Sequence, residues 1–380
     1  MAAPEPGSPP PRTPSFNAGF FLGQGWPYLL VPFIPLAVAL KLGGASDTVV
    51  FVASALGIIP TAALMGRATE ELASRSGAAV GGFLNVTFGN APELIIALFA
   101  LGRGLHELVK ATLIGSVIGN ILLVLGAAML VGGLGRDGQR FSPRTANAQS
   151  RMLVLAAVAF AVPAVFQLAR GDGLPRVGPE HLDFSSAVEV ISGLIAAVLI
   201  VAYVFGLLAS LRSARASAPA YEQEGLWGWS VRTSVAMLAV AGGLVGVMSE
   251  VLVGSIHAAS ESLGLSEFFI GAVVVAIVGN AAEHWVAVLV ARKDHMDLSV
   301  NIAIGSAAQV ALFVAPVLVL AGFFIGPAPL PLVFNAFELG AVFLAVGVAY
   351  YVAHDGKSTW AEGAVLLAVY VTLAIVFLFV

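Results

Sequence analysis

The stretches FGNAPELI at 88–95 and VGNAAEHW at 278–285 are nearly the same phrase, written twice in one chain. Each lies within a long apolar segment and carries one carboxylate, Glu93 or Glu283. A carboxylate at the centre of a membrane helix costs a few kcal/mol even on lenient insertion scales. Neither segment offers a nearby Lys or Arg, so each acid needs a function or a partner elsewhere in the fold.

The composition is that of an integral membrane protein. Of 380 residues, 59% are hydrophobic and 11% are charged, and the mean hydropathy is +0.95. Apolar stretches long enough to cross a hydrocarbon core of about 30 Å follow one another along nearly the whole chain. The alternating pattern of barrel strands is absent, and 42 glycines suit closely packed membrane helices. We therefore predict an all-α integral membrane protein, and the absence of cysteine excludes disulfides and thiolate metal sites.

Charged and turn residues divide the apolar sequence into about eleven predicted transmembrane helices. Their approximate limits are 21–42, 48–68, 78–102, 107–133, 151–169, 185–211, 230–258, 267–291, 298–324, 329–352 and 359–380. The first residues are rich in proline and lack an apolar h-region, which predicts a disordered tail rather than a signal peptide. With the N-terminus inside, thirteen of the 18 basic residues lie in cytoplasmic segments and five in outer segments, which favours that orientation.

An ungapped internal repeat relates residues 190 positions apart. It aligns the G-N-A-x-E of the two opening stretches and also the I-G-S of 114–116 with that of 304–306. The predicted organisation is a Pro-rich tail (1–20), a first transmembrane helix (21–45), a five-helix repeat (46–212), a polar linker (213–229) and a second five-helix repeat (230–380). Because five is odd, the second repeat is inverted, which brings the two acids together near the bilayer centre, as in secondary transporters.

The residues before each acid favour a distorted helix. Gly89 and Gly279 lie four residues before the acids, and Pro92 lies directly before Glu93. Proline removes a backbone donor and glycine permits distortion, so freed carbonyls can face a cavity. Carboxylates, asparagine amides and carbonyls form an all-oxygen site that suits a hard cation such as Ca²⁺. Close helix packing is an equally good explanation of the glycines taken alone.

Further polar residues accompany the acids in both repeats. Candidates to complete the site are Asn90, Ser116, Asn120, Asn280, Ser306 and Gln309. Taken singly, Ser116, Asn120, Ser306 and Gln309 are each better explained by a hydrogen bond between helices, whereas their repeat-related places after the acidic helices favour a role in the site. Asn85, about two turns before Glu93, is a candidate for an access path, with packing as an equal alternative. Glu71 and Glu261 are candidates for the mouths of the access paths, with a solvated charge at a helix end as the stronger alternative.

Three stretches carry a resemblance to a known family: GGFLNVTFGNAPELI, LGLSEFFIGAVVVAIVGNAAEHWVAV and MDLSVNIAIGSAAQVALFVAPVLVL. They resemble the paired signature repeats of the calcium/proton exchanger family within the cation/calcium exchanger superfamily, over roughly residues 50 to 330. The resemblance implies one N-terminal helix followed by two inverted five-helix repeats. It also implies that Glu93 and Glu283 bind Ca²⁺ and H⁺ alternately, helped by the carbonyls of Gly89 and Gly279 and by Gln309.

The chain also departs from the family pattern. Gly119 stands where many relatives carry Ser, and Pro92 replaces a small or branched residue. The linker holds only Glu222 and Glu224 where relatives often have a longer acidic helix, so calcium regulation there is not expected. His284 matches the family's residue after the second acid, but a neighbouring position on a helix points about 100° away from that acid.

Two facing carboxylates provide a mechanism for exchange. They titrate as a coupled pair, so protons compete with a divalent cation for the same oxygens. If access changes only when the site is charge-compensated, exchange becomes obligatory. The predicted function is therefore Ca²⁺/H⁺ antiport, with Ca²⁺ as the transported substrate, no resident cofactor and no enzymatic activity.

Other functions remain as alternatives. A Na⁺/Ca²⁺ or other cation exchanger is the alternative among transporters, although neutral Gln309 stands where sodium-coupled relatives tend to carry an acid. A cation channel fits paired inverted acids less well, and an intramembrane metalloenzyme lacks an H-E-x-x-H motif among its six histidines. The expected partners are Ca²⁺, H⁺ and the lipid bilayer, without nucleic acid, and a homo-oligomer is compatible with the sequence. The short N-terminal tail favours a prokaryotic plasma membrane.

Overall fold

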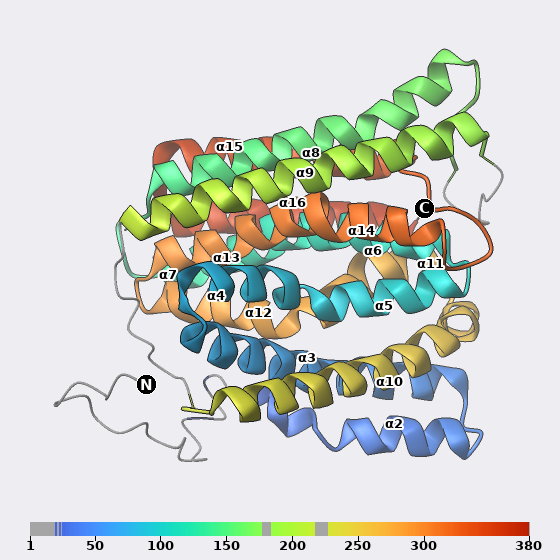
Figure 1. The fold of residues 1–380 in the computed structure, drawn as a ribbon, viewed down its shortest axis with the longest axis horizontal. Coiled ribbons are helices and arrows are strands. Elements are labelled where there is room, and N and C mark those ends of the chain that lie inside the picture. The colour runs from blue at the N-terminus through green and yellow to red at the C-terminus, as the bar shows by residue number, and fades with distance from the viewer. Residues whose placement is uncertain (1–19, 21–22, 24, 177–183, 217–226, 380) are drawn as a thin grey trace.

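The computed structural model describes residues 20, 23, 25–176, 184–216 and 227–379, most of them in helices (Figure 1). Residues 1–19 of the predicted tail and 217–226 of the predicted linker lie outside the described residues. The N-terminal segment comprises η1 (Trp26–Leu30) and α2 (Phe33–Leu42). The next set comprises α3 (Asp47–Arg75), α4 (Gly77–Gly89), α5 (Ala91–Gly102), α6 (His106–Ile118), η2 (Gly119–Val124), α7 (Leu125–Gly133), β1 (Gln139–Arg140), α8 (Pro143–Ala169) and α9 (Ser186–Ala216).

The second set repeats this order. It comprises α10 (Val231–Leu263), α11 (Glu267–Phe269), η3 (Ile270–Val275), α12 (Ala276–Arg292), α13 (Met296–Gln309), η4 (Val310–Val314), α14 (Ala315–Gly322), α15 (Ala336–Asp355), β2 (Lys357–Ser358) and α16 (Trp360–Leu378). The short strands β1 and β2 pair antiparallel, so they tie the loop before α8 to the loop before α16.

The described residues contain nine helical segments that are long and apolar enough to cross a membrane. The bent pair α4 and α5 would add a tenth, and the segment Trp26–Leu42 is a shorter apolar helix. This confirms the predicted all-α membrane fold with one extra N-terminal helix. The predicted first span was longer than the structure shows, because prolines interrupt it: Pro27 opens η1 and Pro32 precedes α2.

The two sets are inverted relative to each other, as predicted. Their first helices, α3 and α10, pack side by side and run in opposite directions (Figure 1). The helices α5, α6, α12 and α13 lie between this pair and an outer layer of α8, α9 and α15 (Figure 1). The exact limits of the repeats, 46–212 and 230–380, stay predictions.

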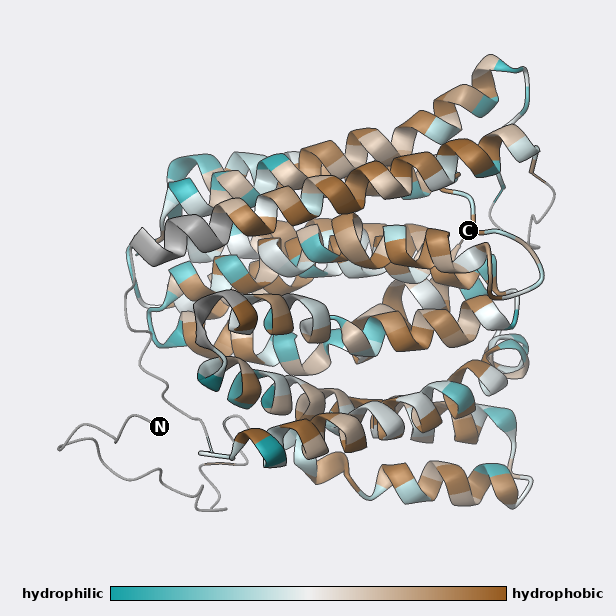
Figure 2. Cartoon of the chain, viewed as in Figure 1, coloured by the Kyte–Doolittle hydropathy of each residue, from teal (hydrophilic) through white to brown (hydrophobic). Residues whose placement is uncertain are grey.

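Apolar side chains cover the outside of the molecule as well as its core. On α9, Val198 and Phe205 are 64% and 68% exposed, and Figure 2 shows this helix as largely hydrophobic. A soluble protein would bury such residues, whereas in a membrane protein they face the lipid chains. The outer surface of α9 is therefore lipid-facing.

Gly115 permits a close approach between the two sets. A Cβ atom at this position would overlap the backbone carbonyl of Ala272 in η3. Such small residues let the backbones of membrane helices come into direct contact. Gly115 of the I-G-S motif thus allows α6 to pack directly against η3 of the second repeat.

We expect Gly115→Ala to destabilise the protein by about 1–3 kcal/mol, because α6 or η3 must shift to make room. The measurement is thermal unfolding of the purified protein in mild detergent. The matched control is Gly340→Ala on α15, where a new Cβ meets nothing within 4 Å. The control should keep or raise the unfolding temperature, and equal stability of both variants would contradict this account of the packing.

Candidate functional site

Glu93 lies at the start of a helix in the middle of the fold. Helix α4 ends at Gly89 and α5 begins at Ala91, with Asn90 between them and a bend of 44°. Pro92 occupies one of the first two helical positions, where a missing N–H costs nothing. The unpaired amides and dipole of a helix N-terminus favour an acidic group in the first turn, which is where Glu93 lies, 4% exposed.

The second acid is positioned differently, which corrects one prediction. Helix α12 runs from Ala276 to Arg292 without a break, so Gly279 does not loosen the helix before Glu283. The physical reason is that Ala282, unlike Pro92, keeps its N–H and continues the helix. The irregular backbone of this half lies earlier, in the π-helical segment η3.

The inverted fold places each acid against the glycine of the other repeat. A Cβ on Gly279 would lie 3.5 Å from Cγ of Glu93, and a Cβ on Gly89 would lie 3.7 Å from Oε1 of Glu283. The glycines therefore leave room for the opposite acid, and the side chains of Glu93 and Glu283 both lie between the two repeats.

Ser306 is the centre of a hydrogen-bond network around Glu283. Its hydroxyl lies 3.1 Å from Oδ1 of Asn90 and 3.3 Å from Oε2 of Glu283, and it can donate to only one of them at a time. The Nδ2 of Asn120 donates to the Oγ of Ser306 at 3.3 Å. The Nδ2 of Asn90 donates to Oε1 of Gln309 at 2.6 Å. Polar residues of both repeats thus meet at this acid.

The repeat-related contact on the other side is sparser. Asn280 donates from Nδ2 to the Oγ of Ser116 at 3.4 Å and to the carbonyl of Ala276 at 3.0 Å. This pair matches Asn90 and Ser306 at the repeat offset of 190, but Gly119 stands at the position of Gln309. Oε2 of Glu93 is buried without a hydrogen-bond partner among the described residues. Buried acceptors are rarely left unpaired, so this oxygen is available to a cation or a proton.

Two π-helical segments flank the site, and sequence analysis did not predict them. The segments η2 and η4 occupy matching positions in the two repeats, directly after the I-G-S motifs. Asn120 lies within η2, and Gln309 immediately precedes η4. Such widened turns occur frequently at functional sites because they re-aim side chains and free backbone groups.

Two predicted residues lie outside this network. Asn85 is exposed on α4. His284 is half-buried, and its Nε2 has no hydrogen-bond partner in the part of the chain that the structure describes.

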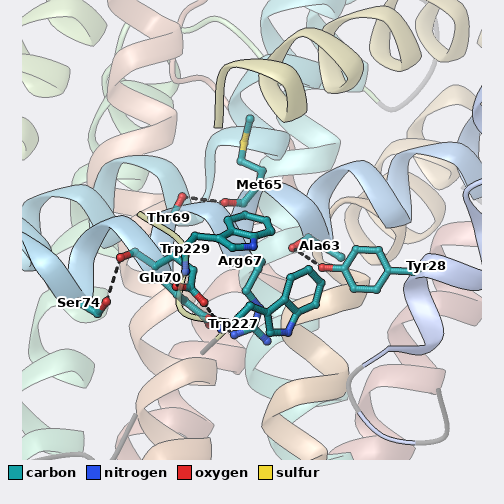
Figure 3. A network of polar contacts seen from close by, with 10 residues as sticks. Tyr28, Ala63, Met65, Arg67, Thr69, Glu70, Ser74, Trp227 and Trp229 are labelled. Atoms are coloured by element: carbon teal, nitrogen blue, oxygen red, sulfur yellow. Dashed lines mark hydrogen bonds and ion pairs between the residues drawn. The ribbon is translucent and has the colours of Figure 1, made fainter. Parts of the chain in front are cut away.

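Glu71 is not the solvated helix-end charge that the stronger alternative described. It is fully buried, and its carboxylate accepts hydrogen bonds from the backbone N–H groups of Trp227 and Trp229. Figure 3 shows these tryptophans beside Arg67 and Glu70 at the end of α3, where the guanidinium of Arg67 lies 5.3 Å from the ring centre of Trp227. Glu71 therefore links α3 to the segment directly before α10 through hydrogen bonds.

Glu261 does match the solvated interpretation. Its side chain is 72% exposed and lies 3.6 Å from Nε2 of His257, one turn away on α10. The repeat-related acids thus have different environments, because only Glu71 meets the chain segment that joins the two repeats. An access-path role for either acid stays a prediction.

Glu70 is a further acidic residue near the end of α3 that sequence analysis did not select. It forms an ion pair with Arg67 at 3.1 Å. Comparing the repeats selected the neighbouring Glu71, because its counterpart Glu261 is acidic while the counterpart of Glu70 is Ser260. A residue whose counterpart in the other repeat has a different chemistry, as Glu70 has in Ser260, is not selected by comparing the repeats.

The donor set suits an oxygen-binding cation. Within the described residues, no group of three or more His, Asp or Glu side chains converges on one point. A cation here would be held by two carboxylates with amide, hydroxyl and carbonyl oxygens. Such a set fits Ca²⁺ better than a metal that prefers histidine or thiolate.

The hydrogen-bond network of Asn90 is larger than that of Asn280, so we predict that replacing these two residues has unequal effects on Ca²⁺ binding. We expect Asn90→Ala to weaken Ca²⁺ binding about tenfold or more, because it leaves Oε1 of Gln309 without its buried donor and removes one of the two acceptors of Ser306. Asn280→Ala, which removes a long contact to Ser116, should cost only about two- to threefold. Isothermal titration of both variants with Ca²⁺ measures the difference. Equal losses would show that the network around Glu283 does not position the cation.

The sequence is similar to those of known ion exchangers. The sequence model of the sodium/calcium exchanger protein family matches residues 46–212 and 233–379. The chain belongs to this family. The chain is similar to a Ca²⁺/H⁺ antiporter of Synechocystis sp., to which it is 43% identical over 92% of this chain and 96% of the antiporter. The Ca²⁺/H⁺ antiporter ChaA of Bacillus subtilis is 42% identical, with coverage of 92% and 97%.

A solved structure supports the same family assignment. The structure of native YfkE has a TM-score of 0.78 and 40% sequence identity, covering 93% of this chain and all of YfkE. Membership in this exchanger family makes the chain a multi-pass membrane transporter and not an enzyme. The resemblance drawn from the sequence motifs is thereby confirmed.

Proposed function

We propose that this protein is a secondary active antiporter that exchanges Ca²⁺ for H⁺, with Glu93 and Glu283 as the shared binding groups. The observation that carries the proposal is the reciprocal placement of each acid against the glycine of the opposite repeat. The Ca²⁺/H⁺ antiporters of Synechocystis sp. and Bacillus subtilis, related over most of their length, support the same choice of ions.

The exchange follows from competition for the same oxygens. Ca²⁺ requires both carboxylates ionised, so its binding displaces protons, and protonation displaces Ca²⁺. An empty site with two bare carboxylates in a buried place is costly, so the protein changes access only when Ca²⁺ or protons compensate the charge. Ser306 supports both states, because its hydroxyl can donate to Glu283 or turn to Asn90.

The direct test is ⁴⁵Ca²⁺ uptake into proteoliposomes under imposed gradients. An outward proton gradient should drive uptake, and dissipating it with a protonophore should abolish uptake. An outward sodium gradient at equal internal and external pH should have no effect. Uptake driven by sodium instead would replace this proposal with Na⁺/Ca²⁺ exchange, and uptake without any gradient coupling would indicate a channel.

We also propose that the N-terminus is cytoplasmic and that the membrane is a prokaryotic plasma membrane. The distribution of thirteen basic residues inside and five outside supports this orientation. The chain contains no cysteine, so single cysteines report on it cleanly. In whole cells, an impermeant maleimide should label Asp172→Cys but not Asp137→Cys, both of which replace exposed residues. The opposite pattern would invert the orientation.

A further inference from the structure

An apolar groove opens on the lipid-facing side between α2, α5 and α10. Its volume is about 600 Å³, and the residues that decide its shape are Val38, Phe99, Gly243 and Gly246, with Lys41 and Glu250 at its edge. It lies away from the exchange site and plays no part in the network around the two acids. Helices α2, α5 and α10 all run toward the same end of the molecule (Figure 1).

Charges are confined to one end of this groove. On α2, Lys41 follows Val38 by about one turn, and on α5, Arg103 follows Phe99 by about one turn. On α10, Glu250 follows Gly243 by about two turns. Because the helices are parallel, their charged residues gather at one rim while the apolar lining lies one to two turns deeper. A groove with charged residues at one end and apolar residues along the rest has the same division as an amphiphilic molecule such as a lipid.

The rim carries opposite charges in equal number. Lys41 Nζ lies 3.6 Å from Asp47 Oδ1, and Arg103 Nη2 lies 2.5 Å from Glu250 Oε1. All four side chains are about half exposed, so they can also reach a headgroup at the membrane surface. The one cation and the one anion that line the groove, Lys41 and Glu250, match a headgroup that bears both a phosphate and an ammonium better than one that bears only negative charge.

Glycines create the space for the apolar part. A Cβ on Gly243 would meet nothing within 4 Å, and one on Gly246 would lie 3.9 Å from Phe99. Glycine in a helix interior is unfavourable compared with residues that have a side chain. Two such residues facing the same groove leave a channel along α10 that an acyl chain can fill.

We propose that this groove is a binding site for one zwitterionic membrane phospholipid, with an acyl chain between α10 and α5 and its phosphate at Lys41. The lipid then lies between α5, which carries Glu93, and the pair α2 and α10. It bridges these elements on the outside of the molecule, where they make no other polar contact than that between Arg103 and Glu250 among the residues that the structure describes.

The test is native mass spectrometry of protein released from vesicles of equal parts phosphatidylethanolamine and phosphatidylglycerol. Wild type should retain one phosphatidylethanolamine, and Gly243→Leu, whose Cβ meets nothing within 4 Å and whose longer side chain occupies the groove, should reduce this occupancy at least fivefold. The matched control is Gly347→Leu on α15, another exposed helical glycine whose Cβ meets nothing within 4 Å. It should retain the lipid as wild type does.

Two outcomes would overturn the proposal. One is unchanged lipid occupancy in Gly243→Leu, and the other is retention of phosphatidylglycerol at the same level as phosphatidylethanolamine. Because leucine is a better helix former than glycine, both variants should fold, and size-exclusion chromatography verifies this. A second variant, Lys41→Ala, keeps the groove open and should lower occupancy by removing the phosphate contact. The readout is independent of the transported ions, so it does not depend on the proposed function.

Discussion

Replacing either acid with glutamine is expected to lower Ca²⁺-dependent flux by at least about 100-fold, because an amide neither ionises for Ca²⁺ nor exchanges a proton. The variants are Glu93→Gln and Glu283→Gln, which keep nearly the same shape. Since both acids belong to one site, either substitution alone should have the full effect. The measurement is ⁴⁵Ca²⁺ uptake driven by a proton gradient in proteoliposomes.

The control separates this effect from the loss of any membrane-segment carboxylate. Glu189→Gln, in the first turn of α9 and outside the network around the two acids, should transport like wild type. Gradient-driven exchange that persists in either site variant would refute a shared site. Additive partial losses would instead point to two independent half-sites.

Much of the fold could be predicted because the repeat signal is strong. The match of G-N-A-x-E and I-G-S at one offset predicted inversion, and the structure packs α3 against α10 in opposite directions, as inversion requires. The broken helix at Asn90 also followed from sequence, since Gly89 and Pro92 both disfavour continuous helix there. The inversion follows from the repeat itself, and the helix break follows from residues next to Asn90 in the sequence.

Features that depend on contacts between repeats could not be predicted in this way. Glu71 and Glu261 occupy equivalent positions in the repeated sequence. Only Glu71 is buried, and its carboxylate accepts hydrogen bonds from the backbone N–H groups of Trp227 and Trp229. The π-helical segments η2 and η4 arise where tertiary packing overrides the regular turn, and their residues show no distinct pattern. Pairwise hydrogen bonds such as Asn90 to Gln309 likewise require the folded geometry.

The two halves of the site are therefore related but unequal. Glu283 has Ser306 within hydrogen-bond distance, whereas Oε2 of Glu93 has no partner among the described residues. The equivalent serine of the first repeat, Ser116, is instead hydrogen-bonded to Asn280.

The glycines opposite the acids give the second large effect. We expect Gly89→Leu and Gly279→Leu to lower exchange by at least about 100-fold, because each new side chain enters the space of the opposite carboxyl group. Alanine at the same positions should keep exchange within about tenfold of wild type, because its Cβ makes only ordinary contact. Its distances are 3.7 Å to Oε1 of Glu283 and 3.5 Å to Cγ of Glu93.

This graded series distinguishes a shared site from simple helix packing. If the glycines served only packing, Leu variants would lose stability in proportion to transport. In a shared site, Gly279→Leu should displace the carboxyl group of Glu93 and abolish Ca²⁺ binding in isothermal titration at a temperature where the variant is still fully folded. Gly347→Leu, on the exposed face of α15, controls for the added bulk and should bind Ca²⁺ normally. Normal binding by Gly279→Leu would mean that the cation does not lie between the two repeats.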